Sequence, residues 1–114
     1  MADNIFAKII RKEIPAKIVY EDDQALAFWD VEPKARVHIL IVPKKDITRI
    51  SEAGAADEAL LGHLLTVAAE VARTEGVDET GYRIVINNGP HAGESVPHLH
   101  VHLLGGREMN WPPG

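Results

Sequence analysis

The sequence contains no cysteine. This absence excludes disulfide bonds, thiolate nucleophiles and thiolate-ligated metal sites. The chain also lacks an excess of positive charge, because its formal net charge at pH 7 is −5. A protein that binds nucleic acid irrespective of sequence needs many Lys or Arg contacts to phosphates, so we expect no nucleic-acid partner. A small phosphorylated ligand, held by backbone N–H groups and a few side chains, is still compatible with this charge.

Long apolar stretches are missing as well. No apolar run approaches the roughly 20 residues that a membrane-spanning helix needs, so we expect no membrane partner. The N-terminus lacks the basic and then apolar order of a signal peptide, which favours a cytoplasmic protein. The 114 residues, of which 46% are hydrophobic and 25% charged, suit one soluble domain over residues 1–114.

Hydrophobic spacing predicts two helices and five strands. Asp3 or Asn4 is placed to cap a short helix whose apolar face comprises Ile5, Phe6, Ile9 and Ile10. Strands are predicted over residues 18–21, 25–30, 37–43, 82–87 and 97–104. Residues 37–43 are apolar on both faces, which predicts a central strand covered on both sides. Short connections favour antiparallel pairing, so we expect an α+β domain with the helices on one face of the sheet.

The second helix is predicted over residues 56–75 and ends before Gly76. Its apolar stripe is predicted to comprise Leu60, Leu61, Leu64, Leu65, Ala68, Val71 and Ala72.

Half of the six histidines fall within residues 98–102. His98, His100 and His102 alternate there with apolar residues, so on a strand they would share one face while Leu99, Val101 and Leu103 face the core. A core needs the aliphatic face but has no use for a row of imidazoles. The pattern therefore indicates chemistry more strongly than packing.

Residue types alone leave three interpretations of these histidines open. They could form a zinc site with an open fourth position, with His38 as a further ligand from a neighbouring strand. A neutral imidazole could instead attack a phosphorus or acyl centre, with its other nitrogen donating to an acceptor. Gly89, Gly93 and Ser95 in the preceding loop suit that second chemistry, because glycines let backbone N–H groups approach phosphate oxygens. The third interpretation is that the histidines are partly exposed residues with no role.

The alternating histidines resemble the signature of the histidine-triad (HIT) superfamily. Four other segments, residues 4–15, 27–30, 38–45 and 105–114, are similar to its histidine-triad nucleotide-binding (HINT) branch. The resemblance therefore covers almost the whole chain, and it favours nucleophilic catalysis over a metal site.

The resemblance implies a purine nucleoside phosphoramidase that uses no metal and no other cofactor. Such enzymes hydrolyse the P–N bond that joins adenosine or guanosine monophosphate to an amine, and they also process aminoacyl adenylates. The implied fold is a five-stranded antiparallel sheet with two main helices. Two subunits would form a homodimer with a continuous ten-stranded sheet.

The resemblance also implies roles for five catalytic residues. His100 would attack the α-phosphorus and form a nucleotidyl-histidine, while a backbone carbonyl accepts the proton on its other nitrogen. His102 would bind and polarise the phosphate. His98 and His38 would support the cluster through hydrogen bonds, and Ser95 would contact a phosphate oxygen or the leaving group.

The nucleotide-binding positions follow from the same resemblance. Asp30 would accept from the ribose hydroxyls, and Asn87 and Gly93 would lie at the phosphate. The apolar slot for the base would comprise Ile5, Phe6, Ile9, Phe28 and Val31. From spacing alone, the first three of these would be predicted as core residues, and Asp30 could merely cap the turn before Pro33.

The chain departs from the family pattern near the phosphate loop. Pro90 and His91 stand where many relatives carry an acidic residue, and Glu94 stands where many carry glutamine. A carboxylate at residue 94 would repel a phosphate unless it points outward. In the tail, Asn110 stands where some relatives have histidine, and Trp111 is expected to need cover.

Two functions of different class follow from the sequence. The leading hypothesis is a homodimeric, metal-independent nucleoside phosphoramidate hydrolase. The alternative is a purine-nucleotide-binding or scaffold module whose hydrolysis is vestigial, for which Glu94 is the motivation.

Overall fold

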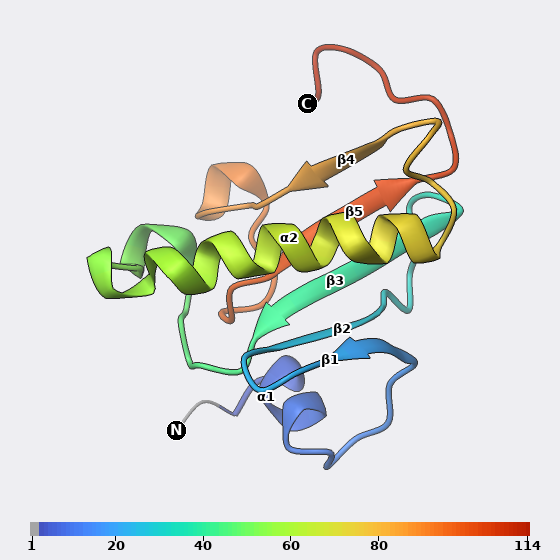
Figure 1. The fold of residues 1–114 in the computed structure, drawn as a ribbon. Helices are drawn as coiled ribbons and strands as arrows, with labels where there is room; N and C mark the ends of the chain where they lie inside the picture. The colour runs from blue at the N-terminus through green and yellow to red at the C-terminus, as the bar shows by residue number, and fades with distance from the viewer. Residues whose placement is uncertain (1–2) are drawn as a thin grey trace.

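The computed structural model describes residues 3–114. Its elements are α1 (Ile5–Ile10), β1 (Ile18–Glu21), β2 (Ala25–Trp29), β3 (Val37–Pro43), α2 (Glu58–Thr74), β4 (Tyr82–Val85) and β5 (Val101–Gly105), with 3₁₀ turns η1 (Ile50–Glu52), η2 (Ala55–Asp57) and η3 (Pro90–Ala92) (Figure 1). Within this range, no helix has both the length and the apolar character needed to cross a membrane.

The strands form one antiparallel sheet, as predicted. The order of the five strands is β1-β2-β3-β5-β4. β3 lies at the centre and is buried along its whole length, which confirms the predicted central strand. Its Ile41 pairs with Ala27 of β2 on one side and with Val101 of β5 on the other. β3 and β5, the two strands that carry site histidines, are therefore direct neighbours.

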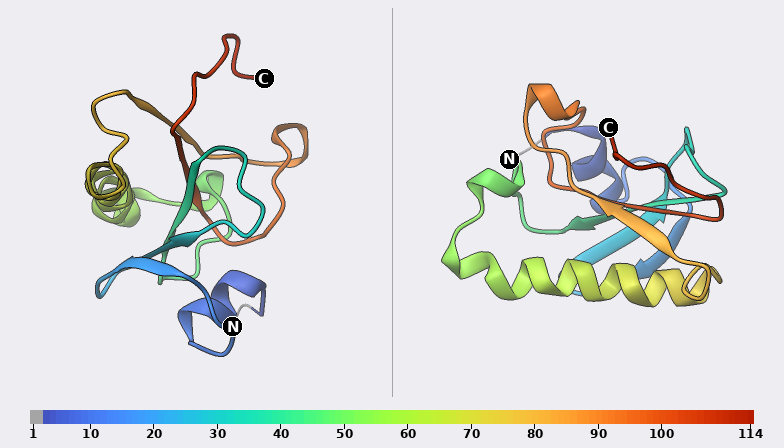
Figure 2. Two further views of the ribbon diagram at one scale, coloured as in Figure 1. Left: turned by 90° about the vertical axis from the view of Figure 1, so that its right-hand side faces the viewer. Right: turned by 90° about the horizontal axis from the view of Figure 1, so that it is seen from above.

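Each face of the sheet is covered by a different helix (Figure 2). On one face, Leu64, Val67 and Val71 of α2 share a core with Ile39 and Ile41 of β3. The other face carries a second core under α1, formed by Phe6, Ile9, Leu26, Phe28, Leu40 and Val42. The prediction that both helices lie on one face is therefore wrong. Because β3 is apolar on both sides, each side needs its own cover.

The two helices are unequal, so the prediction of two main helices is wrong for the first. α2 has 17 residues and is the one main helix, whereas α1 has six. Asn4 caps α1, because its Oδ1 accepts a hydrogen bond from the Ala7 N–H at 2.9 Å. α2 starts two residues later than predicted because η2 occupies residues 55–57, and it ends before Gly76, whose φ is +75°.

The predicted stripe of α2 contains one error. Leu65 is predicted to face the core, but the residue is 45% exposed. Val67 takes its place in the core, at helical spacing from Leu64 and Val71.

Three strands are shorter than predicted. β2 ends at Trp29, one residue early, and β4 ends at Val85, two residues early. β5 begins at Val101 instead of residue 97. The early end of β4 follows from the late start of β5, because Val85 already pairs with His102 and the residue that would stand opposite residue 87 precedes β5.

Candidate active site

Strand register brings two histidines together across β3 and β5. His102 of β5 pairs with Leu40, and His38 lies two residues away on the same side of β3. Nε2 of His38 is 2.9 Å from Nδ1 of His102. The ring centroids of His102 and His100 are 5.0 Å apart. The rings of His38, His100 and His102 therefore form one histidine cluster, on the face of the sheet that α1 covers.

The segment before β5 does not pair with the sheet, and the chain joins it only at Val101. In the register of β3 and β5, residue 99 would stand opposite Pro43, which has no backbone N–H to donate. The chain bonds elsewhere: the N–H of His98 donates to Val96 and that of Leu99 donates to Ile47, both at 2.8 Å. The predicted strand over residues 97–104 is therefore wrong before Val101.

His98 lies beneath the histidine cluster and is almost fully buried. Its Nε2 donates to the carbonyl of Pro43 at 2.9 Å. Its Nδ1 has no hydrogen-bond partner in the described part of the chain. The main-chain carbonyl of His98 accepts a hydrogen bond from Nδ1 of His100 at 2.7 Å. His98 thus contacts His100 through its backbone, and its ring anchors this segment to the end of β3.

The hydrogen bond to His98 determines the tautomer of His100. Because a carbonyl oxygen only accepts, Nδ1 of His100 carries the proton and Nε2 keeps a free lone pair. The ring packs edge-on against Phe6, with centroids 4.9 Å apart. Burial lowers the pKa of His100, and the bond to the His98 carbonyl opposes that shift. A neutral ring with an unprotonated Nε2 is the form that can attack an electrophile.

A second chain of hydrogen bonds determines the tautomers of His38 and His102. The backbone N–H of Lys34 donates to Nδ1 of His38 at 3.0 Å, so the proton of neutral His38 is on Nε2. That proton points at Nδ1 of His102, which leaves the proton of His102 on Nε2. Burial lowers the pKa of both rings, and the neighbouring imidazoles help to bring the pKa of His102 to about 4. This series of hydrogen bonds therefore ends in Nε2–H of neutral His102, which can donate.

Asp30, His38 and His102 are close enough to hold a cation, since their ligand atoms lie within 4.8 Å of one another. The hydrogen bonds argue against that use. A metal on Nε2 of His38 would require the proton on Nδ1, where it would oppose the N–H of Lys34. For the same reason, the 3.5 Å approach of His38 Nε2 to Asp30 Oδ2 involves a neutral ring and is not an ion pair.

The carboxylate of Asp30 is divided between two environments. Oδ1 accepts a hydrogen bond from the N–H of Glu32 at 2.8 Å, which confirms the turn-capping interpretation for that oxygen. Oδ2 faces His38. Asp30 also lines the cleft described next.

A cleft of about 650 Å³ opens beside the histidine cluster. Predicted site residues in its lining are Ile5, Phe6, Ile9, Phe28, Asp30, Val31, His38, Ser95 and His102. Its volume lies in the range of small-molecule sites. Apolar side chains of α1 and β2 therefore share one cleft with two members of the histidine cluster, His38 and His102.

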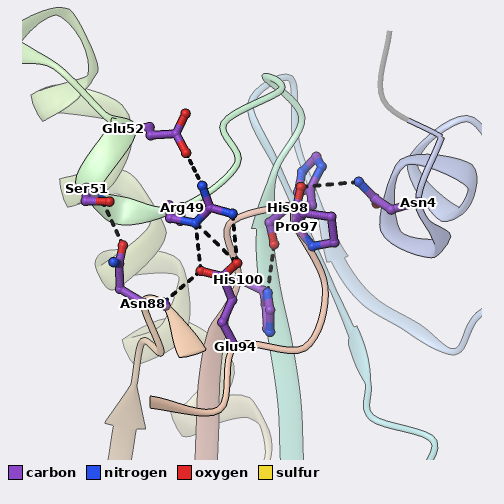
Figure 3. Close-up of polar contacts among 10 residues, drawn as sticks. Asn4, Arg49, Ser51, Glu52, Asn88, Glu94, Pro97, His98 and His100 are labelled. Atoms are coloured by element: carbon purple, nitrogen blue, oxygen red, sulfur yellow. Dashed lines mark hydrogen bonds and ion pairs between the residues drawn. The ribbon is translucent and has the colours of Figure 1, made fainter. Parts of the chain in front are cut away.

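The carboxylate of Glu94 is not free, because it points toward Arg49 (Figure 3). Nε of Arg49 lies 2.9 Å from its Oε1, and Nη2 of Arg49 lies 3.0 Å from its Oε2. Oε1 also accepts the N–H of Gly89 at 3.0 Å. These partners hold the pKa of Glu94 below its usual range. The carboxylate is therefore ionised and is neutralised by Arg49.

Four predicted site residues are not part of the cleft lining: the buried His98 and His100, and also Asn87 and Gly93. Asn87 follows β4, and Gly93 ends η3 with a φ of +78°, both in the segment that leads to β5. From this segment, the described residues that line the cleft are Ser95 and Val96.

Among the residues that sequence reasoning missed, Lys34 and Arg49 act on the site through hydrogen bonds. Lys34 acts through its main-chain N–H, a group that every residue except proline has, so no sequence signal could have identified it. Arg49 was detectable in part, because a carboxylate at residue 94 of a phosphate loop requires a cation nearby.

Comparison with known proteins agrees with this geometry. Residues 11–109 match the HIT domain family. Over 112 residues the chain is 61% identical to an uncharacterized HIT-like protein of Synechococcus elongatus, covering 98% of this chain and 97% of that one. A crystal structure of a HIT family hydrolase from Legionella pneumophila has a TM-score of 0.96 and 47% identity, covering 98% of this chain and 100% of that chain. A histidine triad nucleotide-binding protein from Candida albicans has a TM-score of 0.83 and 30% identity, covering 96% of this chain and 83% of that chain. The chain therefore belongs to the HIT family.

Proposed function

We propose that this HIT protein hydrolyses the P–N bond of purine nucleoside phosphoramidates, and also aminoacyl adenylates, through a nucleotidyl-histidine on His100. The observation that carries the proposal is the hydrogen bond from Nδ1 of His100 to the His98 carbonyl. It leaves an unprotonated Nε2 beside an N–H donor on His102. The relatives described as a hydrolase and as a nucleotide-binding protein support the reaction class and the ligand class.

The lining of the cleft supports a purine mononucleotide as the bound part of the substrate. The base would pack against the apolar slot of Ile5, Phe6, Ile9, Phe28 and Val31. Oδ2 of Asp30 would accept from the ribose hydroxyls. The phosphate would lie among His100, His102 and Ser95, within reach of backbone N–H groups near Asn87 and Gly93.

In the first step, Nε2 of His100 attacks the α-phosphorus while the P–N bond breaks and the amine departs with a proton from solvent. The imidazole becomes cationic, and the His98 carbonyl that holds Nδ1–H stabilises that charge. The Nε2–H of His102 donates to a phosphoryl oxygen. In the second step, water attacks phosphorus, its proton goes to solvent, and His100 leaves as a neutral ring.

The test is turnover of an adenosine phosphoramidate combined with mass spectrometry of acid-quenched protein. We expect His100→Ala to reduce turnover by at least about a thousandfold, the scale on which loss of a nucleophile is felt. A nucleotide mass should appear on the peptide spanning residues 97–104 when breakdown is slowed by His102→Asn. Equal turnover by wild type and His100→Ala would refute the proposal. Tight mononucleotide binding without turnover or adduct would instead support the nucleotide-binding module.

We also propose the homodimer with a continuous sheet, joined along β4. β4 is an edge strand, and its Val85 lies on the opposite side from Ile84, which packs on the α2 core. Trp111 is 81% exposed beside Arg83, so its expected cover would come from a partner. Light scattering should give twice the chain mass, and Val85→Glu should shift it toward the monomer. A monomeric wild type at micromolar concentration would refute the dimer.

A further inference from the structure

The loop between β4 and β5 is tied at both ends to the segment around η1 (Figure 3). Near its start, Oδ1 of Asn88 accepts the backbone N–H of Ser51 at 2.9 Å. Near its end, the carboxylate of Glu94 accepts hydrogen bonds from the guanidinium of Arg49 and from the N–H of Gly89. The 89–95 loop is thus closed by its own glutamate, and Arg49 holds that glutamate from outside the loop.

The position of Glu94 creates an electrostatic conflict that the rest of the loop does not solve. Its neighbour Ser95 lines the cleft, so a carboxylate stands one residue from the proposed phosphate site. Two unit charges about 8 Å apart interact by roughly 2 kcal/mol at an effective dielectric constant of about 20. Unpaired, Glu94 would therefore weaken binding of an anion next to it.

Arg49 is well placed to remove this conflict. Its contact with Glu94 is a two-point, fork-shaped one, the geometry that makes arginine–carboxylate pairs specific. The Glu94 side chain is 12% exposed and that of Arg49 is 31% exposed, so water screens this pair only in part. Glu52, on the same segment, also contacts Arg49 and holds the guanidinium from its other side.

We propose that Arg49 is a positioning residue for the phosphate site, which acts through Glu94 by neutralising its carboxylate and fixing the 89–95 loop. The inference rests on the proposed nucleotide site but not on hydrolysis. It predicts that Arg49 matters for ligands that carry a phosphate and not for the nucleoside alone. It also predicts that removing Glu94 compensates for the loss of Arg49.

The experiment compares binding of AMP and of adenosine by calorimetry, using full-length protein. Arg49→Gln should weaken AMP binding roughly tenfold, the equivalent of about 1.4 kcal/mol, and leave adenosine binding unchanged. Glu94→Gln keeps an oxygen for the Gly89 N–H and removes the negative charge, so it should bind AMP at least as tightly as wild type. The double variant Arg49→Gln/Glu94→Gln should recover AMP affinity to within about twofold of wild type. Arg73→Gln, which removes one positive charge from the last turn of α2, is the matched control and should change neither affinity.

A second measurement reports on the loop itself. Amide hydrogen exchange at Gly89 should accelerate in Glu94→Ala, which lacks the acceptor, and stay near wild type in Glu94→Gln. This readout needs no ligand.

The outcomes separate the inference from the function on which it rests. An unchanged ratio of AMP to adenosine affinity in Arg49→Gln overturns the inference, and so does a double variant that binds AMP no better than Arg49→Gln. If these ratios shift as expected while wild type turns over no phosphoramidate, hydrolysis fails and the inference stands. If wild type binds AMP no better than adenosine, both the phosphate site and the role of Arg49 fail.

Discussion

At the scale of single residues, main-chain groups set the tautomers of His100 and His38, and the ring of His38 in turn sets that of His102. The His98 carbonyl places the proton of His100 on Nδ1, and the Lys34 N–H places the proton of His38 on Nε2. Three imidazoles of the same intrinsic chemistry thereby acquire different properties. His100 presents a lone pair, whereas His102 presents an N–H donor.

These tautomers can be observed directly. Imidazole ¹⁵N chemical shifts at neutral pH should identify His100 as the Nδ1–H form and His38, His98 and His102 as the Nε2–H form. His38→Phe removes the donor to His102 and should let His102 sample both tautomers. An Nε2–H form of His100 in the wild-type protein would contradict the assignment and remove the proposed nucleophile.

The pH profile of the proposed reaction tests the same residue. Attack requires neutral His100, whose pKa is lowered from 6.5 by burial. The acid limb of kcat/KM should therefore have its midpoint below pH 6.5. An acid limb with its midpoint at or above 6.5 would contradict a buried neutral nucleophile. The measurement needs a substrate without a titrating group in this range.

At the scale of elements, the six-residue helix α1 contributes to both the core and the cleft. It covers one face of the sheet and contributes Ile5, Phe6 and Ile9 to the cleft. So short a helix has little stability of its own and depends on its cap and its packing. Asn4 caps α1 and also fastens it to the rest of the fold, since its Nδ2 lies 3.5 Å from the carbonyl of Pro97, next to His98.

Removing this cap should affect both stability and binding. Asn4→Ala should lower the free energy of unfolding by roughly 1 kcal/mol, measured by urea denaturation. It should also weaken AMP and adenosine binding equally, because the base slot and not the phosphate site is loosened. Asn4→Asp retains the cap oxygen and is the matched control. An Asn4→Ala variant as stable as wild type would show that packing alone holds α1.

The ends of elements and the faces they cover were the least predictable features of the fold. Spacing correctly predicted the existence of every strand and the buried, central position of β3. It failed for the start of β5, because that start depends on Pro43 of a different strand. It also failed for the placement of α1, because an apolar face in a sequence does not specify which side of a sheet it will cover.

At the scale of the whole molecule, burying His38, His100 and His102 in neutral form couples folding to pH. The unfolded chain takes up protons near pH 6.5 that the folded chain rejects, and the pKa of His102 is lowered to about 4. Stability should therefore fall as pH drops below 6.5, before the carboxylates of lowered pKa, such as Glu94, begin to lose their contribution.

This loss can be measured by urea unfolding at several pH values. Between pH 6.5 and about 4, His102 alone should contribute a decrease on the order of 3 kcal/mol in the free energy of unfolding. His102→Asn should show a correspondingly shallower dependence over that range. A free energy of unfolding that is constant down to pH 4.5 would contradict neutral burial of these rings.

The sequence alone determined the class of fold, the central strand and the identity of the histidine cluster, because these follow from local alternation and from a motif that covers most of the chain. Only the tertiary structure decided which groups set each tautomer, since the His98 carbonyl and the Lys34 N–H reach the rings through the fold and main-chain groups leave no side-chain pattern. The same holds for Glu94, which sequence reasoning treated as a liability for phosphate binding. The fold brings Arg49, 45 positions away in sequence, within hydrogen-bonding distance of it, so that the charge of Glu94 is paired.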